Sequence, residues 1–181
     1  MIDEILEHNR KMVGKRACEQ SATDKYPKKR TAIVSCMDTR LLELLPEALG
    51  YKNGDIKMIK NAGGVIRSPF DSTMLSLLVG VYELGVENIM VIGHTNCGVQ
   101  GMKADEMIHL MIERGIPKER IDFIKKCGID LDSWLTGFED TAEAILDTVD
   151  LIRNHPLMPE DVKVKGYVID SITGELTPYE R

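Results

Sequence analysis

Two cysteines and one histidine in this chain have the types and the sequence neighbours of metal ligands. Cys36 opens the segment Cys-Met-Asp-Thr-Arg, and His94 and Cys97 frame the segment Gly-His-Thr-Asn-Cys-Gly. Thiolate sulfur and imidazole nitrogen suit zinc, and a catalytic zinc site typically takes three protein ligands and leaves the fourth position to water or substrate. The three residues therefore predict a zinc site with one open position.

The other two cysteines lie outside any recognisable metal-binding pattern. Cys18 and Cys127 stand alone, and neither belongs to a Cys-x-x-Cys pair of the kind found in zinc ribbons and thioredoxin-like redox sites. We expect both to be inert. A second interpretation of Cys36 and Cys97 stays open at this point: free cysteine is often buried, so both could be ordinary packing residues at strand ends.

Short apolar runs rich in β-branched residues alternate along the chain with segments of helical periodicity. The expected strands cover residues 31–36, 56–60, 88–93 and 162–169, with a short extended segment at 175–177. The expected helices cover residues 2–17, 41–49, 72–84, 104–114, a short stretch ending at 126, and 141–155, with Gly50 and Gly85 as left-handed caps and Thr141 as an N-cap.

Alternation of strands and helices indicates an α/β fold with a parallel sheet. We expect one domain over residues 1–181, with a mainly parallel central sheet of four strands, a short C-terminal edge strand and flanking helices. Residues 1–20 would form an N-terminal helical arm. Cys36 ends the first expected strand, and His94 and Cys97 follow the third. If those strands are neighbours, the ligands meet outside the carboxyl ends of the strands, where open α/β sheets build their sites.

The composition excludes several classes of partner. The 181 residues include 29 acidic and 23 basic side chains, for a formal net charge of −6, and 43% of the residues are hydrophobic. Nucleic acid and anionic membranes are therefore poor partners, and the longest basic run is Lys28-Lys29-Arg30. The N-terminus is amphipathic and acidic, unlike a secretory signal, and no apolar stretch approaches the length of a membrane span. We expect a soluble cytoplasmic protein.

The combined motifs resemble the β-class carbonic anhydrase family. The matching segments are Cys36-x-Asp38-x-Arg40, the run Asn-Ala-Gly-Gly ending at Gly64, and Gly-His94-x-x-Cys97-Gly. The short chain and the methionine after Cys36 are similar to the compact prokaryotic members. The resemblance implies one zinc ion per subunit on Cys36, His94 and Cys97. It also implies an activity: a zinc-bound hydroxide would attack carbon dioxide to give bicarbonate and a proton, and the reaction would be reversible.

Asp38 and Arg40 supply the second catalytic element that the resemblance implies. Asp38 would accept a hydrogen bond from the hydroxide and orient it, and Arg40 would keep Asp38 ionised and turned away from the metal. In some family members the matching aspartate closes the site by binding zinc. We expect the open form here at neutral pH or above. The switching subgroup has a tryptophan three residues before the first cysteine, and Ile33 occupies that position.

The resemblance also suggests where carbon dioxide and bicarbonate would bind. Gly63 and Gly64 would let the backbone approach the metal ligands or donate an N–H group, although a simple turn is an alternative for them. Phe70 would line the substrate pocket, often from the partner subunit. Pro27 and Val79 replace a glutamine and a tyrosine of plant-type members. Family members form homodimers, often assembled as dimers of dimers, in which the N-terminal helix wraps the partner.

Two other functions remain open from the sequence. The same zinc site could serve a carbon disulfide or carbonyl sulfide hydrolase, because those substrates are isosteric with carbon dioxide. The chain could instead be a non-catalytic zinc-binding or thiol redox module in which Cys36 and Cys97 form a disulfide. His8, His109 and His155 are expected to be surface or packing residues.

Overall fold

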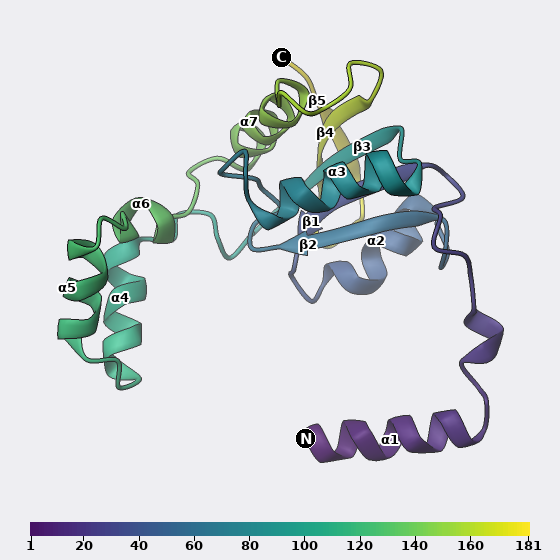
Figure 1. Ribbon diagram of the computed structural model, residues 1–181, viewed down its shortest axis with the longest axis horizontal. Helices are drawn as coiled ribbons and strands as arrows, with labels where there is room; N and C mark the ends of the chain where they lie inside the picture. Colours follow the sequence, from purple (N-terminus) through teal and green to yellow (C-terminus); the bar gives the residue numbers. More distant parts are fainter.

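The computed structural model describes residues 1–181 and is built around a five-stranded sheet (Figure 1). The strands are β1 (Thr31–Cys36), β2 (Ile56–Asn61), β3 (Asn88–His94), β4 (Lys163–Ile169) and β5 (Leu176–Tyr179). Their order in the sheet is β2-β1-β3-β4-β5, the first four strands are parallel, and β5 runs antiparallel to β4. The predicted α/β fold, with four parallel strands and a C-terminal edge strand, is confirmed.

Helices cover both faces of the sheet. On one face, α3 (Ser72–Leu84) and α7 (Thr141–Arg153) contribute Met74, Leu77 and Ile145 to the larger hydrophobic cluster. On the other face, α2 (Leu41–Leu49) contributes Leu41 and Leu45 to a second cluster. The central strand β1 is buried on both sides, as expected for a parallel sheet between helical layers.

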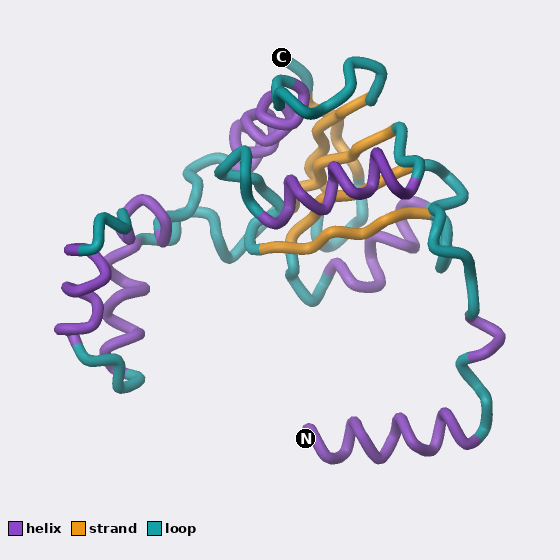
Figure 2. Tube along the Cα trace, viewed as in Figure 1, coloured by secondary structure: helices purple, strands orange, loops and turns teal.

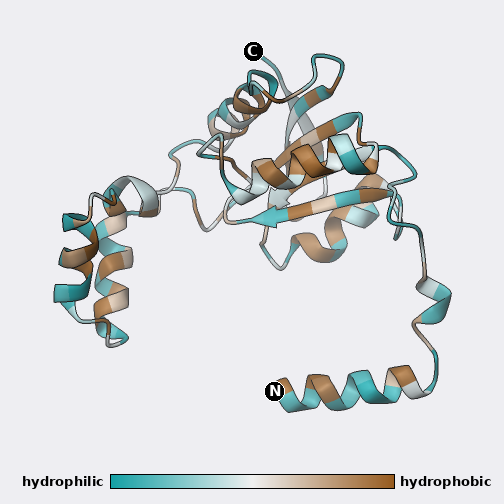
Figure 3. Ribbon diagram, in the orientation of Figure 1, coloured by the Kyte–Doolittle hydropathy of each residue, from teal (hydrophilic) through white to brown (hydrophobic).

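Two helical parts stand away from the sheet (Figure 2). The first is α1 (Ile2–Gly14), which has no buried residue and is followed by the 3-10 helix η1 (Glu19–Ser21). The second is a helical hairpin of α4 (Ala104–Glu113), α5 (Lys118–Lys126) and α6 (Leu131–Leu135). The hairpin has a small core of its own, made of Ala104, Ile121, Leu131 and Leu135. Both parts carry apolar residues (Figure 3). None of the helices combines the length and apolarity needed to cross a bilayer.

The structure corrects several details of the helix predictions. α1 ends at Gly14, three residues earlier than expected, and α6 was not predicted because five residues are too few for a recognisable helical period. Thr141 as an N-cap was wrong. Asp140 is the cap, since its carboxylate accepts the Glu143 N–H at 2.8 Å, while the Thr141 hydroxyl donates to Gln100.

The two predicted glycine caps are confirmed. Gly50 (φ 63°) ends α2 and Gly85 (φ 70°) ends α3, both in the left-handed conformation. Such caps stop each helix before the chain turns into the next strand.

Candidate metal centre

The sheet brings the two ligand segments together at the carboxyl ends of β1 and β3. These strands are neighbours in the sheet, with Ser35 paired to Ile92, although β2 lies between them in the sequence. β1 is therefore flanked by β2 on one side and β3 on the other, which makes the gap between β1 and β3 the point where strand order reverses. Cys36 is the last residue of β1 and His94 the last residue of β3. The predicted convergence is confirmed.

The donor atoms of Cys36, His94 and Cys97 form one buried group. All lie within 4.8 Å of one another, and the three residues are at most 5% exposed. The two Sγ atoms are 3.9 Å apart. Sulfurs on a tetrahedral zinc with bonds of about 2.3 Å would lie about 3.8 Å apart, whereas a disulfide bond is about 2.05 Å long. Both cysteines are free thiols, so the arrangement fits a metal and not a disulfide.

The imidazole of His94 is oriented as a metal ligand. Its Nδ1 lies 2.9 Å from the Thr95 carbonyl oxygen, which makes Nδ1 the donor and leaves Nε2 unprotonated. Nε2 is buried and has no hydrogen-bond partner. Burial lowers the pKa of His94, so the ring is neutral near pH 7. A buried, unpartnered nitrogen beside two thiols is the observation that fits a zinc ion best, because a metal would satisfy it.

The protonation state of the thiols couples metal binding to pH. Burial raises the pKa of the Cys97 thiol, and the neighbouring Cys36 sulfur raises it further. Zinc binds thiolate, so a metal entering this group must displace a thiol proton. The metal affinity of the site should therefore increase with pH.

Asp38 lies beside this group but is held by Arg40. Its Oδ2 is 3.9 Å from His94 Nε2, and the carboxylate is not among the donors that cluster within 4.8 Å. Hydrogen bonds from Arg40 hold the pKa of Asp38 well below its usual range, and Asp38 in turn raises the pKa of Arg40. The segment is not extended, because Arg40 has helical backbone angles at the N-cap of α2. The pair forms across a tight turn.

Three neighbouring residues were not singled out by the sequence analysis. Ser171, in the turn after β4, accepts a hydrogen bond from Arg40 Nη1 at 3.3 Å. Thr95 holds Ser171 through its hydroxyl, and Lys60 Nζ donates to the Cys36 carbonyl at 3.0 Å. Only Thr95 carries a sequence signal, since it lies inside the His94–Cys97 segment. Lys60 and Ser171 are common polar residues whose positions depend on the fold.

The Gly63-Gly64 turn follows β2 and packs directly against Cys36. Both glycines have positive φ, 86° and 69°. A Cβ atom on Gly64 would lie 2.8 Å from the Cys36 backbone nitrogen, closer than real Cβ contacts allow. Asn61 holds the turn by donating to the Val65 carbonyl at 2.8 Å. The backbone therefore approaches Cys36 closely, as expected for this turn.

Phe70 lies at the surface within this chain. It is 78% exposed, and its ring makes an edge-to-face contact with the buried His155, with centroids 5.5 Å apart. His155 Nε2 donates to the Pro69 carbonyl at 2.9 Å and Nδ1 accepts the Leu157 N–H at 3.2 Å, so His155 is the packing residue that was expected. No contact within one chain places Phe70 at the metal group.

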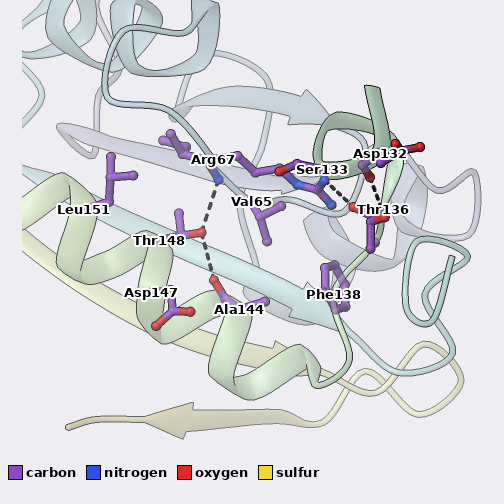
Figure 4. A pocket seen from close by; sticks show the side chains of 12 residues that line it. Val65, Arg67, Asp132, Ser133, Thr136, Phe138, Ala144, Asp147, Thr148 and Leu151 are labelled. Carbon is purple, nitrogen blue, oxygen red and sulfur yellow. Dashed lines mark hydrogen bonds between the residues drawn. The ribbon is translucent and has the colours of Figure 1, made fainter. Parts of the chain in front are cut away.

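A separate cavity of about 660 Å³ lies between the segment after β2, α6 and α7. Figure 4 shows Arg67, Thr136, Thr148 and Phe138 around it, and none of the three candidate ligands lines it. Arg67 donates to the Thr136 carbonyl and ties the helical hairpin to the sheet. Phe138 packs against both hydrophobic clusters and would meet a Cβ on Gly63 at 3.0 Å. Phe138 thus lines the cavity and also packs against the cluster that contains Cys36 and Cys97.

Comparison with known proteins identifies the family. A model of the carbonic anhydrase family matches residues 31–176, a span that contains the metal group, Asp38 and Arg40. The crystal structure of β-carbonic anhydrase isoform I from Trichomonas vaginalis superimposes with a TM-score of 0.89 at 34% identity, covering 98% of this chain and 96% of that one. The chain belongs to the β-carbonic anhydrase family.

Two further relatives differ in their sequence identity to this chain. YtiB of Bacillus subtilis is 47% identical over 176 residues, covering 97% of this chain and 94% of YtiB. A carbon disulfide hydrolase of Acidithiobacillus thiooxidans is 30% identical over 159 residues, covering 83% of this chain and 77% of the hydrolase. The resemblance inferred from the motifs is confirmed, and the carbon disulfide hydrolase is the more distant of these two relatives.

Proposed function

We propose that this protein catalyses the reversible hydration of carbon dioxide to bicarbonate and a proton, with one zinc ion per subunit held by Cys36, His94 and Cys97. The observation that carries the proposal is the position of Asp38. Its carboxylate stands next to the buried His94 Nε2, yet it is engaged by Arg40 instead of joining the three metal donors. The chain thus supplies three ligands, and Arg40 holds the carboxylate that would otherwise be a candidate fourth ligand.

The zinc ion would supply Lewis acidity, which lowers the pKa of a bound water towards neutrality and provides the nucleophile. Asp38 would accept a hydrogen bond from that water and aim its lone pair at the carbon of carbon dioxide. This role needs an ionised carboxylate, and Arg40 keeps the pKa of Asp38 low enough to ensure it across the neutral range. The proton released in hydration would leave to solvent.

The substrate-binding roles of Gly63, Gly64 and Phe70 are part of the proposal. The positive φ of both glycines turns the backbone beside Cys36, where an N–H group could bind an oxygen of bicarbonate. Phe70 is too exposed to wall a pocket within its own chain. We therefore assign it to the pocket of a partner subunit.

The surfaces that one chain leaves uncovered support the proposal of a homodimer or a dimer of dimers. α1 exposes Ile2, Ile5 and Leu6, and a helix with no buried residue gains little stability unless its apolar side finds a partner. α3 exposes Leu75 and Tyr82 on one side. A second copy of the chain would cover both helices. The exposed free thiols of Cys18 and Cys127 favour a cytoplasmic location, where such thiols stay reduced.

A stopped-flow assay with a pH indicator tests the proposed reaction. The zinc-loaded protein should hydrate carbon dioxide well above the buffer rate at pH 8, and Cys97→Ser should remove both zinc and activity. The same preparations should be offered carbon disulfide, with release of hydrogen sulfide as the readout. Zinc-loaded protein that hydrates no carbon dioxide would contradict the proposal, and turnover of carbon disulfide alone would support the hydrolase instead.

A further inference from the structure

Ser171 connects Arg40 to a part of the chain that the catalytic motifs do not include. It lies in the turn between β4 and β5, is only 8% exposed, and is 131 positions from Arg40. Its hydroxyl oxygen accepts a hydrogen bond from Arg40 Nη1 at 3.3 Å. Because a guanidinium can only donate, Ser171 must be the acceptor in this contact.

Thr95 fixes the position of Ser171. The Thr95 hydroxyl oxygen accepts the Ser171 backbone N–H at 2.9 Å and lies 3.1 Å from Ser171 Oγ. The Thr95 backbone N–H donates to the Ile169 carbonyl at 3.1 Å, and the Thr95 carbonyl is the partner of His94 Nδ1. The residue next to a metal ligand therefore holds the serine that contacts Arg40.

The other hydrogen bonds of Arg40 leave Nη1 to Ser171. Nε and Nη2 bind the two oxygens of Asp38 at 2.9 and 2.7 Å, and Nη2 also donates to the Asn96 carbonyl at 2.9 Å. Ser171 Oγ is the hydrogen-bond partner that the structure gives to Nη1. A planar guanidinium held at both Nη atoms cannot rotate about its Cζ–Nε axis without losing a contact. Ser171 and Asn96 thus set the plane in which Arg40 meets Asp38.

We propose that Ser171, anchored by Thr95, is a positioning residue that keeps Arg40 paired with Asp38 and so keeps the Asp38 carboxylate off the metal. Asp38 Oδ2 is 3.9 Å from His94 Nε2, so a carboxylate released by Arg40 would lie beside a metal held at that nitrogen. The turn after β4 then biases the site between an open form and a form closed by Asp38. This inference rests on the proposed zinc site and is independent of which substrate the site uses.

Cobalt(II) substitution gives a readout of metal coordination that does not depend on activity. Visible spectra should be recorded from about pH 6 to pH 9 for the wild type, Ser171→Ala and the double variant Ser171→Ala/Asp38→Ala. Losing a hydrogen bond to a charged group should shift the balance from open to closed by about tenfold or more. The Ser171→Ala spectrum should show carboxylate binding at a pH where the wild-type spectrum does not, and the double variant should lose that change.

Thr173→Ala is the matched control. Thr173 lies in the same turn, and its hydroxyl contacts Asp170 and the Glu175 N–H instead of Arg40, so this variant should keep the wild-type spectrum. Thr95→Val removes the hydroxyl that anchors Ser171 and should reproduce the Ser171→Ala spectrum even if that variant folds poorly. A Ser171→Ala spectrum equal to wild type, or a change that persists without Asp38, would overturn the inference. A wild type that binds no cobalt would overturn the zinc site itself.

Discussion

The Asp38 carboxylate receives three hydrogen bonds from Arg40. Oδ1 accepts the Arg40 backbone N–H and Nε, both at 2.9 Å, and Oδ2 accepts Nη2 at 2.7 Å. The turn between the two residues makes this possible, because it places the backbone and the side chain of Arg40 on the same carboxylate. One residue thereby keeps Asp38 ionised, oriented and occupied beside the metal donors.

Replacing Arg40 by lysine should separate metal binding from catalysis. Lysine keeps the positive charge but cannot form the two-pronged contact with Asp38. We expect zinc content to stay at one per subunit and kcat/KM for carbon dioxide hydration to fall at least about tenfold. Arg30→Lys is the control, because Arg30 pairs with Glu87 at the opposite end of β1, and it should behave as wild type. An Arg40→Lys enzyme with full activity would show that the two-pronged contact between Arg40 and Asp38 is unimportant for catalysis.

The two classes of cysteine should differ in their effect on zinc. Cys97→Ser replaces the buried thiol of a proposed ligand with a hydroxyl and should lower zinc affinity by more than about 100-fold. Cys127→Ser changes an exposed thiol outside the group and should leave zinc content unchanged. Metal analysis after dialysis against a weak chelator distinguishes the two. Equal zinc retention by both variants would mean that Cys97 is not a ligand.

Gly64→Ala should damage the site more than an equivalent change elsewhere. Alanine at φ 69° costs about 1–2 kcal/mol in backbone conformation, and its Cβ would also press on the Cys36 backbone nitrogen. Gly85 has nearly the same φ, 70°, but nothing within 4 Å of the added Cβ. Chemical unfolding should therefore show a larger loss of unfolding free energy for Gly64→Ala than for Gly85→Ala. Gly64→Ala should also reduce the zinc content. Equal losses of unfolding free energy in the two variants would show that the Cys36 backbone tolerates the added Cβ.

Asp170 should contribute stability that disappears in acid. N–H groups of Thr173 and Ile172 lower the pKa of Asp170 from its usual value of 3.8. A lowered folded-state pKa stabilises the protein above about pH 4, and this stabilisation is lost as the pH falls through the folded value. The stability advantage of the wild type over Asp170→Asn should be constant near neutrality and should shrink between about pH 4 and pH 3.

Urea unfolding of metal-free protein at one fixed concentration measures this difference. Removing the metal excludes acid-driven zinc release, and the fixed concentration excludes changes in assembly. An advantage that stayed constant, or grew, as the pH fell below 4 would contradict the assigned role of Asp170 in the turn that carries Ser171.

The candidate ligands could be predicted from sequence because their positions follow from local patterns and one topological rule. Cys36 and His94 each end a short β-branched run, and parallel sheets gather the carboxyl ends of adjacent strands at one edge. The resemblance to the family motif supplied Asp38 and Arg40. The turn that joins them could not be predicted from the sequence, because the same three residues, Asp38-Thr39-Arg40, could form either an extended segment or a turn at the start of a helix.

Ser171 could not be predicted from the sequence for a different reason. Its contact with Arg40 depends on β4 pairing beside β3, with Ile169 opposite His94, and on the turn that Asp170 shapes. A serine in a polar turn carries no local signal for either relationship. The same limit applies to Phe138, whose packing on both hydrophobic clusters requires the helical hairpin to return to the sheet.

A crystal structure of the zinc-loaded protein at about pH 8, with the metal located by anomalous scattering, tests the central claim most directly. We predict zinc bound by Cys36, His94 and Cys97, a non-protein ligand in the fourth position, and Asp38 still paired with Arg40. Zinc bound by the Asp38 carboxylate, with Arg40 released, would contradict the account.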